Sequence, residues 1–305
     1  MDRFFDAVFL GLSSGAIYAL VALGLVVVFR GTGHLNFAAG EMATFSAYIV
    51  WVVTTWTLFG DSALPLWLAT IGGMVFGFAL GAATEVFIVS PLSKKSPLAV
   101  FVALIAILLG INAIDSGRWG PPPSEEIDSL FPNDPDDFVR LFGAVWRWED
   151  IGTLIVTLAA SALLFLLFAK TKIGLAMRAV ASNPDSSKLV GVPTKLVLAG
   201  SWGLSGALAA LAGVMVAGSQ AQVTPTMMFT IFVYASAAAT LGGLDSPIGA
   251  VVGGLSIGVV ENLAAEFAPG WVGQEMKLSV ALLCIFVVLF VKPSGLFGTE
   301  KVERV

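Results

Sequence analysis

Residues 196–244 decide the fold of this chain: LVLAGSWGLSGALAALAGVMVAGSQAQVTPTMMFTIFVYASAAATLGGL, without one charged side chain. A membrane-spanning helix needs about 20 mainly apolar residues to cross a hydrocarbon layer roughly 30 Å thick. The stretch is therefore too long for one crossing, and its polar centre, residues 220–225, favours a turn. It predicts two membrane-spanning helices joined near Gln220.

The rest of the chain has the same character. Of its 305 residues, 57% are apolar and 12% are charged, against about a quarter charged in soluble domains. The acidic start lacks a basic n-region, which favours an uncleaved first span. Further uncharged windows lie at residues 7–29, 42–60, 62–84, 96–114, 151–169, 246–260 and 278–291. We therefore expect an all-α, polytopic membrane helix bundle of about nine transmembrane helices, forming a single transmembrane domain over residues 1–305.

Basic residues predict the orientation, because Lys and Arg are enriched in cytoplasmic loops. They follow the odd-numbered spans, at Arg30, at residues 94–95, within residues 170–195 and from Lys292 onward. Residues 113–150 instead hold nine Asp and Glu against three Arg, and predict an extracytoplasmic acidic loop. The N-terminus is then outside and the C-terminus in the cytoplasm. The connection at Asp245 lacks a basic residue and Lys277 falls outside, as exceptions.

Small residues four apart predict close helix packing in lipid. They lie at Gly73, Gly77 and Gly81, at Gly206 and Ala210, and at Gly249 and Gly253. We expect these stripes to pack inside the bundle rather than to form a dimer interface.

Glu41 is the ionisable residue most suggestive of function. It follows residues 31–40, in which three glycines weaken regular helix. Broken helix at membrane depth is tolerated where it is buried in protein or lines a cavity. Asn36, Phe37 and Glu41 are thus candidates for the substrate pathway, with a helix cap at the cytoplasmic surface as the alternative for Glu41.

Two other carboxylates lie near the ends of spans. Glu85 precedes Lys94 by a few turns, so we expect its side chain to reach the cytoplasmic interface. Glu261, followed by Asn262, comes at the outer end of its span. It is either functional or simply hydrated, since an intramembrane charge is costly unless paired or wet.

Enzyme chemistry has no basis in the remaining residues. The chain lacks a Gly-x-x-x-x-Gly-Lys phosphate loop, a His-Glu-x-x-His pair and a second cysteine beside Cys284. His34 has no second histidine to form a metal pair, and the acidic residues 134–137 lie in the solvated loop. We expect no catalytic residue, no metal site and no bound cofactor, so any ATP would be bound by another subunit.

Residues 170–195 predict two short helices on the cytoplasmic side. Residues 173–181 have one apolar face, and the sequence Ser182-Asn183-Pro184-Asp185 can cap a second helix. A helix in this position could carry force from an external ATPase. In a solitary transporter it would be an interfacial linker.

Several motifs, in order, resemble the permease family of branched-chain amino-acid (Liv-type) ABC importers. GLSSGAIYALVALG at residues 11–24 looks like the family's first helix, and LNFAAGE at residues 35–41 like its Asn-Phe-Ala-His-Gly-Glu signature, with Ala39 in place of the histidine. GLAMRAVASNP at residues 174–184 is similar to the cytoplasmic coupling segment. Later matches are GVP (191–193), SGALAALAG (205–213), GGLDSPIGA (242–250) and KPSGLFG (292–298).

The resemblance implies a subunit of a bacterial inner-membrane importer for branched-chain amino acids or related small polar solutes. Its partners would be a second, related permease, two cytoplasmic ATPases that bind ATP and Mg, and an extracytoplasmic solute-binding protein. It further implies that residues 170–195 couple to the ATPase through Ala176, Met177, Arg178, Ala179, Ser182, Asn183, Pro184 and Asp185. The alternative is a self-sufficient ion-coupled transporter or channel with Glu41, Glu85 or Glu261 as proton site. A membrane-embedded enzyme ranks last.

Overall fold

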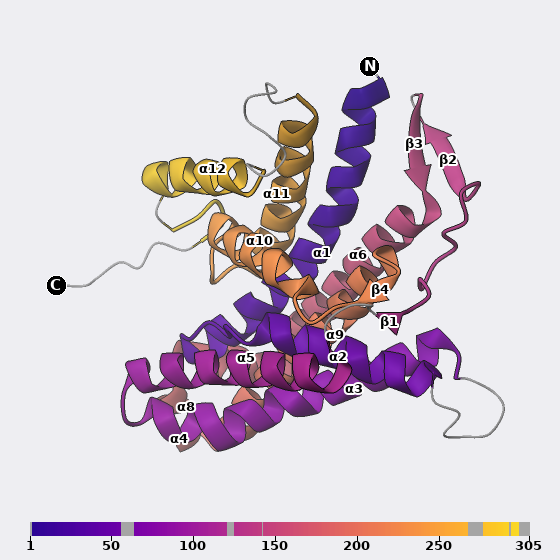
Figure 1. The fold of residues 1–305 in the computed structure, drawn as a ribbon. Helices are drawn as coiled ribbons and strands as arrows, with labels where there is room; N and C mark the ends of the chain where they lie inside the picture. The colour runs from indigo at the N-terminus through magenta and orange to yellow at the C-terminus, as the bar shows by residue number, and fades with distance from the viewer. Residues whose placement is uncertain are drawn as a thin grey trace. The chain divides into compact units, whose positions relative to one another are not determined.

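The computed structural model describes residues 2–55, 64–120, 125–141, 143–267, 277–292 and 294–298, and they are mostly helical (Figure 1). The first part contains α1 (Asp2–Thr32), α2 (Ala39–Thr55), α3 (Leu66–Thr84), the π-helical turn η1 (Glu85–Val89), α4 (Ser90–Ser93) and α5 (Pro97–Trp119). After it come α6 (Trp148–Lys170), α7 (Lys172–Ser182), α8 (Pro184–Leu189), α9 (Thr194–Ser219), α10 (Met227–Gly242), α11 (Pro247–Phe267) and α12 (Lys277–Val291).

Four short strands form two antiparallel pairs. β1 (Glu125–Glu126) pairs with β4 (Gln222–Val223), and β2 (Phe138–Leu141) pairs with β3 (Ala144–Arg147). Part of the predicted acidic loop is thus ordered by strand pairing, while α5 continues beyond the uncharged window to Trp119.

The prediction for residues 196–244 is confirmed, since α9 and α10 flank the polar turn. Six helices among the described residues are long and apolar enough to span a membrane: α1, α3 continued through α4, α5, α6, α9 and α11. α10 is apolar but shorter, and α2 and α12 have 17 and 15 residues. The chain is therefore a multi-pass helical membrane protein, and within the described ranges six spans meet the length requirement, fewer than the predicted nine.

The chain divides into two compact units. The first unit comprises residues 1–26, 131–161 and 233–305, and the second comprises residues 27–130 and 162–232. Since α1, α6 and α10 each contribute residues to both, each unit is assembled from segments far apart in the sequence.

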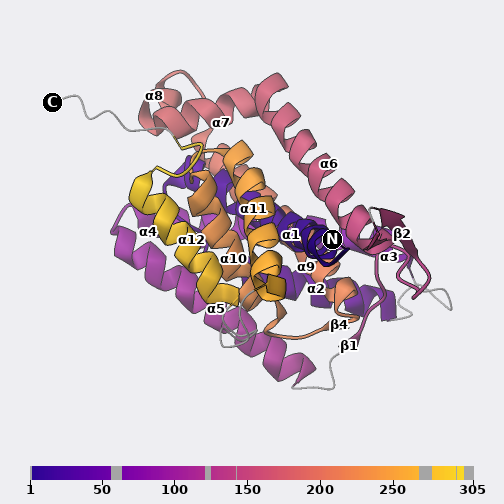
Figure 2. The ribbon, with the colours of Figure 1, turned by 90° about the horizontal axis from the view of Figure 1, so that it is seen from above.

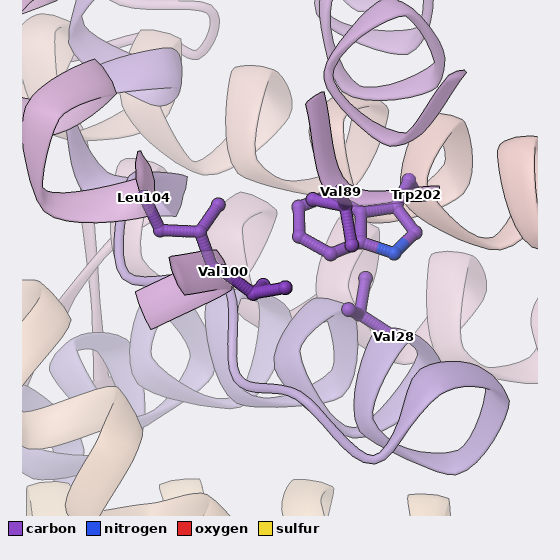
Figure 3. Close-up of a cluster of buried hydrophobic side chains, with 5 residues drawn as sticks. All are labelled: Val28, Val89, Val100, Leu104 and Trp202. Atoms are coloured by element: carbon purple, nitrogen blue, oxygen red, sulfur yellow. The ribbon is translucent and has the colours of Figure 1, made fainter. Parts of the chain in front are cut away.

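Close packing of α3 against α9 builds the centre of the second unit, with α2 packed on both. A Cβ atom added at Gly77 would lie 2.5 Å from the Gly206 carbonyl oxygen and 2.9 Å from the Ala210 Cβ. The predicted internal packing of these small residues is confirmed. Beside this seam, Trp202 is buried with Val28, Val89, Val100 and Leu104 (Figure 3).

In the first unit, α11 packs between α1 and α10 (Figure 1). Added Cβ atoms at Gly11 and Gly15 would lie 2.6 Å from the Val259 Cα and 2.8 Å from the Gly254 carbonyl oxygen. On the other face of α11, Gly249 lies directly against the backbone of Gly242. Small residues thus allow three helices to approach at backbone distance.

The GGLDSPIGA and KPSGLFG motifs lie far apart in the sequence, and residues of both meet in the first unit. The backbone N–H groups of Leu296 and Phe297 donate to the carbonyl oxygens of Leu241 and Gly242, over 2.8 and 2.9 Å. Gly243 and Gly295, at the contact, have φ angles of 105° and 79°, a region that disfavours side chains. Residues 241–243 and 294–298 therefore form one packed corner at the end of α10.

Candidate functional site

The break between α1 and α2 is shaped by Asn36. Gly33 ends α1 with φ 71°, and its N–H donates to the Phe29 carbonyl oxygen. Asn36 is fully buried, and its Oδ1 accepts from the Ala38 N–H over 3.1 Å. Its Nδ2 faces the Met42 sulfur at 3.6 Å. The amide therefore stabilises the turn that starts α2, as short polar side chains commonly do in turns.

Contacts with α5 show where the residues on either side of this break lie along that helix. The Phe37 ring meets Phe101, in the second turn of α5, edge-on at 5.1 Å between centroids. The Glu41 carboxylate instead meets Asn112, about 16 Å further along the helix at 1.5 Å per residue. Since α5 is itself long and apolar enough to span a membrane, α2 begins beside its interior rather than its end.

Glu41 lies in the first turn of α2 and is only 5% exposed. Its Oε2 accepts a hydrogen bond from the Asn112 Nδ2 over 3.3 Å. Asn112 also donates to the Pro225 carbonyl oxygen over 3.1 Å, in the turn before α10. Glu41 is thus buried in a polar network of the second unit rather than exposed on it.

Asp115 is a second carboxylate in this network. It follows Asn112 by one turn of α5, is fully buried, and interacts electrostatically with Glu41. Neither of its carboxylate oxygens has a hydrogen-bond partner among the described residues. One turn further, Trp119 stacks on Tyr48 of α2, with the centroids 4.5 Å apart. Asp115 is thus placed between the polar contact and the aromatic stack that join α5 to α2.

Sequence reasoning missed both Asn112 and Asp115. The uncharged window ends at Ile114, which places Asp115 in the predicted exterior acidic loop. The spacing of Asn112, Asp115 and Trp119 is the signal that could have found them. It places an amide, an acid and an aromatic ring on one face of a helix.

The position of Glu85 contradicts the prediction that its side chain reaches the cytoplasmic interface. The side chain begins η1, is 3% exposed, and its Oε2 has no hydrogen-bond partner in the described part of the chain. It therefore does not reach the interface as expected. The reason is that Glu85 continues the stripe of Gly77 and Gly81 that packs against α9, so the helix turns this side chain inward.

Glu261 is paired rather than simply hydrated. In the first unit its Oε2 accepts from the Tyr18 hydroxyl over 2.7 Å. The Tyr18 ring stacks on Tyr234, with centroids 4.9 Å apart, and the Tyr234 hydroxyl also interacts with Glu261. The carboxylate thus joins α1, α10 and α11. Asn262 lies outside this contact and donates to the Gly258 carbonyl oxygen of its own helix.

The predicted pair of short helices in residues 170–195 is confirmed as α7 and α8 (Figure 2). Asn183 ends α7 and starts α8, where its Oδ1 accepts from the Ser186 N–H over 2.9 Å. The Lys188 ammonium pairs with Asp185 at 2.9 Å and holds the pKa of that exposed carboxyl below its usual range. Capping and a local ion pair thus shape this corner.

The candidate coupling residues differ in exposure. Arg178, Ser182, Asn183, Pro184 and Asp185 are exposed, whereas Ala176 and Ala179 are half-buried. Met177 is buried and its methyl group faces α9 near Gly200, so it packs the helix in place. The Arg178 guanidinium donates to the Phe168 carbonyl oxygen at the end of α6. Large apolar side chains surround this surface and are exposed: Ile173, Leu175, Leu189, Val190 and Leu196.

Several apolar spans and the carboxylates buried among them define a polytopic membrane protein. The chain matches, over residues 7–289, a family described as branched-chain amino acid transport system / permease component. It belongs to this family.

Relatives of nearly the same length agree with this assignment. The chain is 29% identical to the high-affinity branched-chain amino acid transport system permease protein BraD of Pseudomonas aeruginosa, over 97% of this chain and 96% of BraD. It is 26% identical to the permease protein LivH of Escherichia coli, over 99% and 98%. It is 29% identical to a probable LivH of Methanocaldococcus jannaschii, over 93% and 89%. No solved structure matches the chain.

Proposed function

We propose that this chain is the membrane-embedded permease subunit of an ATP-binding-cassette importer that moves branched-chain amino acids, or related small polar solutes, into the cell. The observation that carries the proposal is the match to the permease family from residue 7 to residue 289. The full-length relatives that are named for branched-chain amino acid transport support the substrate class.

The proposed assembly places this chain in the bacterial inner membrane beside a second, related permease. Two cytoplasmic ATPases bind ATP and Mg, and a solute-binding protein delivers the solute from outside. ATP binding and hydrolysis then shift the permeases between outward-open and inward-open states. The exposed polar surface of α7 and α8 supports a contact with an ATPase, and the exposed residues from Arg178 to Asp185 are its candidate docking surface.

We also propose nine crossings, with the N-terminus outside and the C-terminus in the cytoplasm. Beside the six long spans, α2, α10 and α12 complete the count. The basic residues of the 170–195 segment support a cytoplasmic position. The short length of α2 fits a helix that begins within the membrane after broken backbone, as is known where such backbone is covered by protein.

Asn36, Phe37 and Glu41 lie near the solute path in this proposal. The burial of Glu41 and its bond to Asn112 support a functional role, since an ionisable residue inside a membrane is retained at a cost. Phe37 packs between Phe101 and Phe232 in the second unit, and Asn36 holds the turn that aims α2.

Uptake of radiolabelled leucine into proteoliposomes tests the proposed function. We expect uptake by the complete complex when ATP is enclosed with the ATPases and the solute-binding protein is present outside, and none without ATP. Uptake by this chain alone, driven by an ion gradient, would instead support the self-sufficient transporter.

A further inference from the structure

We propose that Asp115, Glu41 and Asn112 form a recognition site for a primary ammonium group, the α-ammonium of an amino acid solute. The inference rests on the proposed function and adds the chemical group that this part of the path would recognise. It starts from Asp115, a fully buried carboxylate whose two oxygens accept no hydrogen bond from any described residue.

Asn112, one turn before Asp115 on α5, has a polar donor group that is already engaged. The Asn112 Nδ2 donates hydrogen bonds to the Glu41 carboxylate and to the Pro225 carbonyl oxygen, over 3.3 and 3.1 Å. Toward the end of α5, the Trp119 ring is stacked on Tyr48. Two buried carboxylates that interact electrostatically thus lie in the same region of the second unit, with Asp115 lacking a donor among the described residues.

Several N–H donors on one cation satisfy this arrangement better than a proton does. A proton on Asp115 removes the charge but adds an O–H donor that itself needs an acceptor. A primary ammonium carries a positive charge and three N–H donors. It offers one N–H donor for each Asp115 oxygen and a third for the Glu41 carboxylate, and charge-assisted hydrogen bonds of this kind are the strong ones.

Access to the site depends on the contact between α2 and α5. Glu41 is nearly buried and Asp115 fully buried, so the site is closed in this structure. The start of α2 beside the interior of α5 makes this contact the place where a solute inside the membrane meets polar groups of both helices. Separation of α2 from α5 at this contact would expose the two carboxylates together.

The test begins with carbodiimide labelling of the purified complete complex. Carbodiimides modify protonated carboxyl groups in apolar surroundings, and peptide mass spectrometry locates the adduct. We expect labelling at Asp115 or Glu41, with protection by leucine and none by 2-hydroxy-4-methylpentanoate, which has the same side chain and carboxylate but no ammonium. Equal protection by both compounds, by neither, or by potassium chloride alone would overturn the proposal.

Uptake by matched variants is the second arm. Asp115→Asn keeps the shape of the side chain and removes its charge, and we expect leucine uptake, as Vmax/KM, to fall about 30-fold or more. The unfolding temperature should stay unchanged or rise, because a buried charge without a partner is removed. Asp136→Asn, at an exposed loop carboxylate, should transport as the wild type. Wild-type uptake by Asp115→Asn would refute the site, whereas absence of ATP-dependent leucine uptake by the wild-type complex would refute the proposed function.

Discussion

Replacing Gly77 with alanine should destabilise the second unit. The added Cβ would lie 2.5 Å from the Gly206 carbonyl oxygen, about 0.9 Å short of ordinary contact at 3.4 Å. It would also lie 2.9 Å from the Ala210 Cβ. The nearest obstacle is backbone and cannot rotate away, so α3 and α9 have to separate.

The magnitude follows from that separation. A gap of about 0.5–1 Å forfeits a quarter to a half of each dispersion contact along the seam, and overpacking of a close-packed interior costs about 1–3 kcal/mol. We expect Gly77→Ala to lower the free energy of unfolding by this amount, measured by thermal or denaturant unfolding of the purified protein in detergent.

Gly72→Ala is the matched control, because it makes the same change on the same helix where an added Cβ meets nothing within 4 Å. It should leave stability unchanged or raise it, because alanine favours a helix more than glycine does. Equal stability of the two variants would refute the inference that backbone contact between α3 and α9 holds this unit together.

Three further outcomes test other parts of the molecule. Ser182→Trp puts a bulky side chain at an exposed site on the proposed docking surface. It should lower uptake relative to ATP hydrolysis in the complete complex, whereas Asp136→Trp should not. Equal coupling of uptake to hydrolysis in both variants would exclude docking at this surface. Tyr18→Phe removes the hydrogen bond to Glu261 and should lower the free energy of unfolding by about 0.6–1.7 kcal/mol. A double-mutant cycle with Glu261→Gln measures the coupling between the two side chains. Additive effects of the two substitutions would contradict this hydrogen bond. In a Cys284→Ser background, cysteines at positions 182 and 136 should react with impermeant thiol reagents from opposite sides of the membrane, and labelling from one side would overturn the proposed orientation.

The substitutions for the docking test follow from local structure. Arg178 and Asn183 are candidate coupling residues, but the first donates to the Phe168 carbonyl oxygen and the second caps α8. A change at either site would disturb the short helices themselves. Ser182 is exposed at the end of α7 and offers a bulky probe without removing a cap, so loss of coupling there reports on docking.

Local rules predicted much of the fold. The charge-free stretch around Gln220 correctly predicted two helices with a polar turn. Apolar length and turn chemistry both depend on residues that are neighbours in the sequence. Asn183 and Pro184 likewise predicted the start of α8. Helix lengths were less well predicted, since α5 runs past the charge of Asp115 to Trp119 where neighbouring groups bury that charge.

The sequence by itself determined that the chain is a helical membrane protein of the permease family, because composition, apolar length and ordered motifs need no partner to be recognised. Only the tertiary structure decided which carboxylates are buried and what each one meets. Glu85 turns inward, Glu261 meets Tyr18, Glu41 meets Asn112, and Asp115 is buried without a hydrogen-bond partner among the described residues. The reason is physical: burial and pairing depend on the rotation and register of one helix against another, and contacts between residues as distant as Glu41 and Asn112 set both.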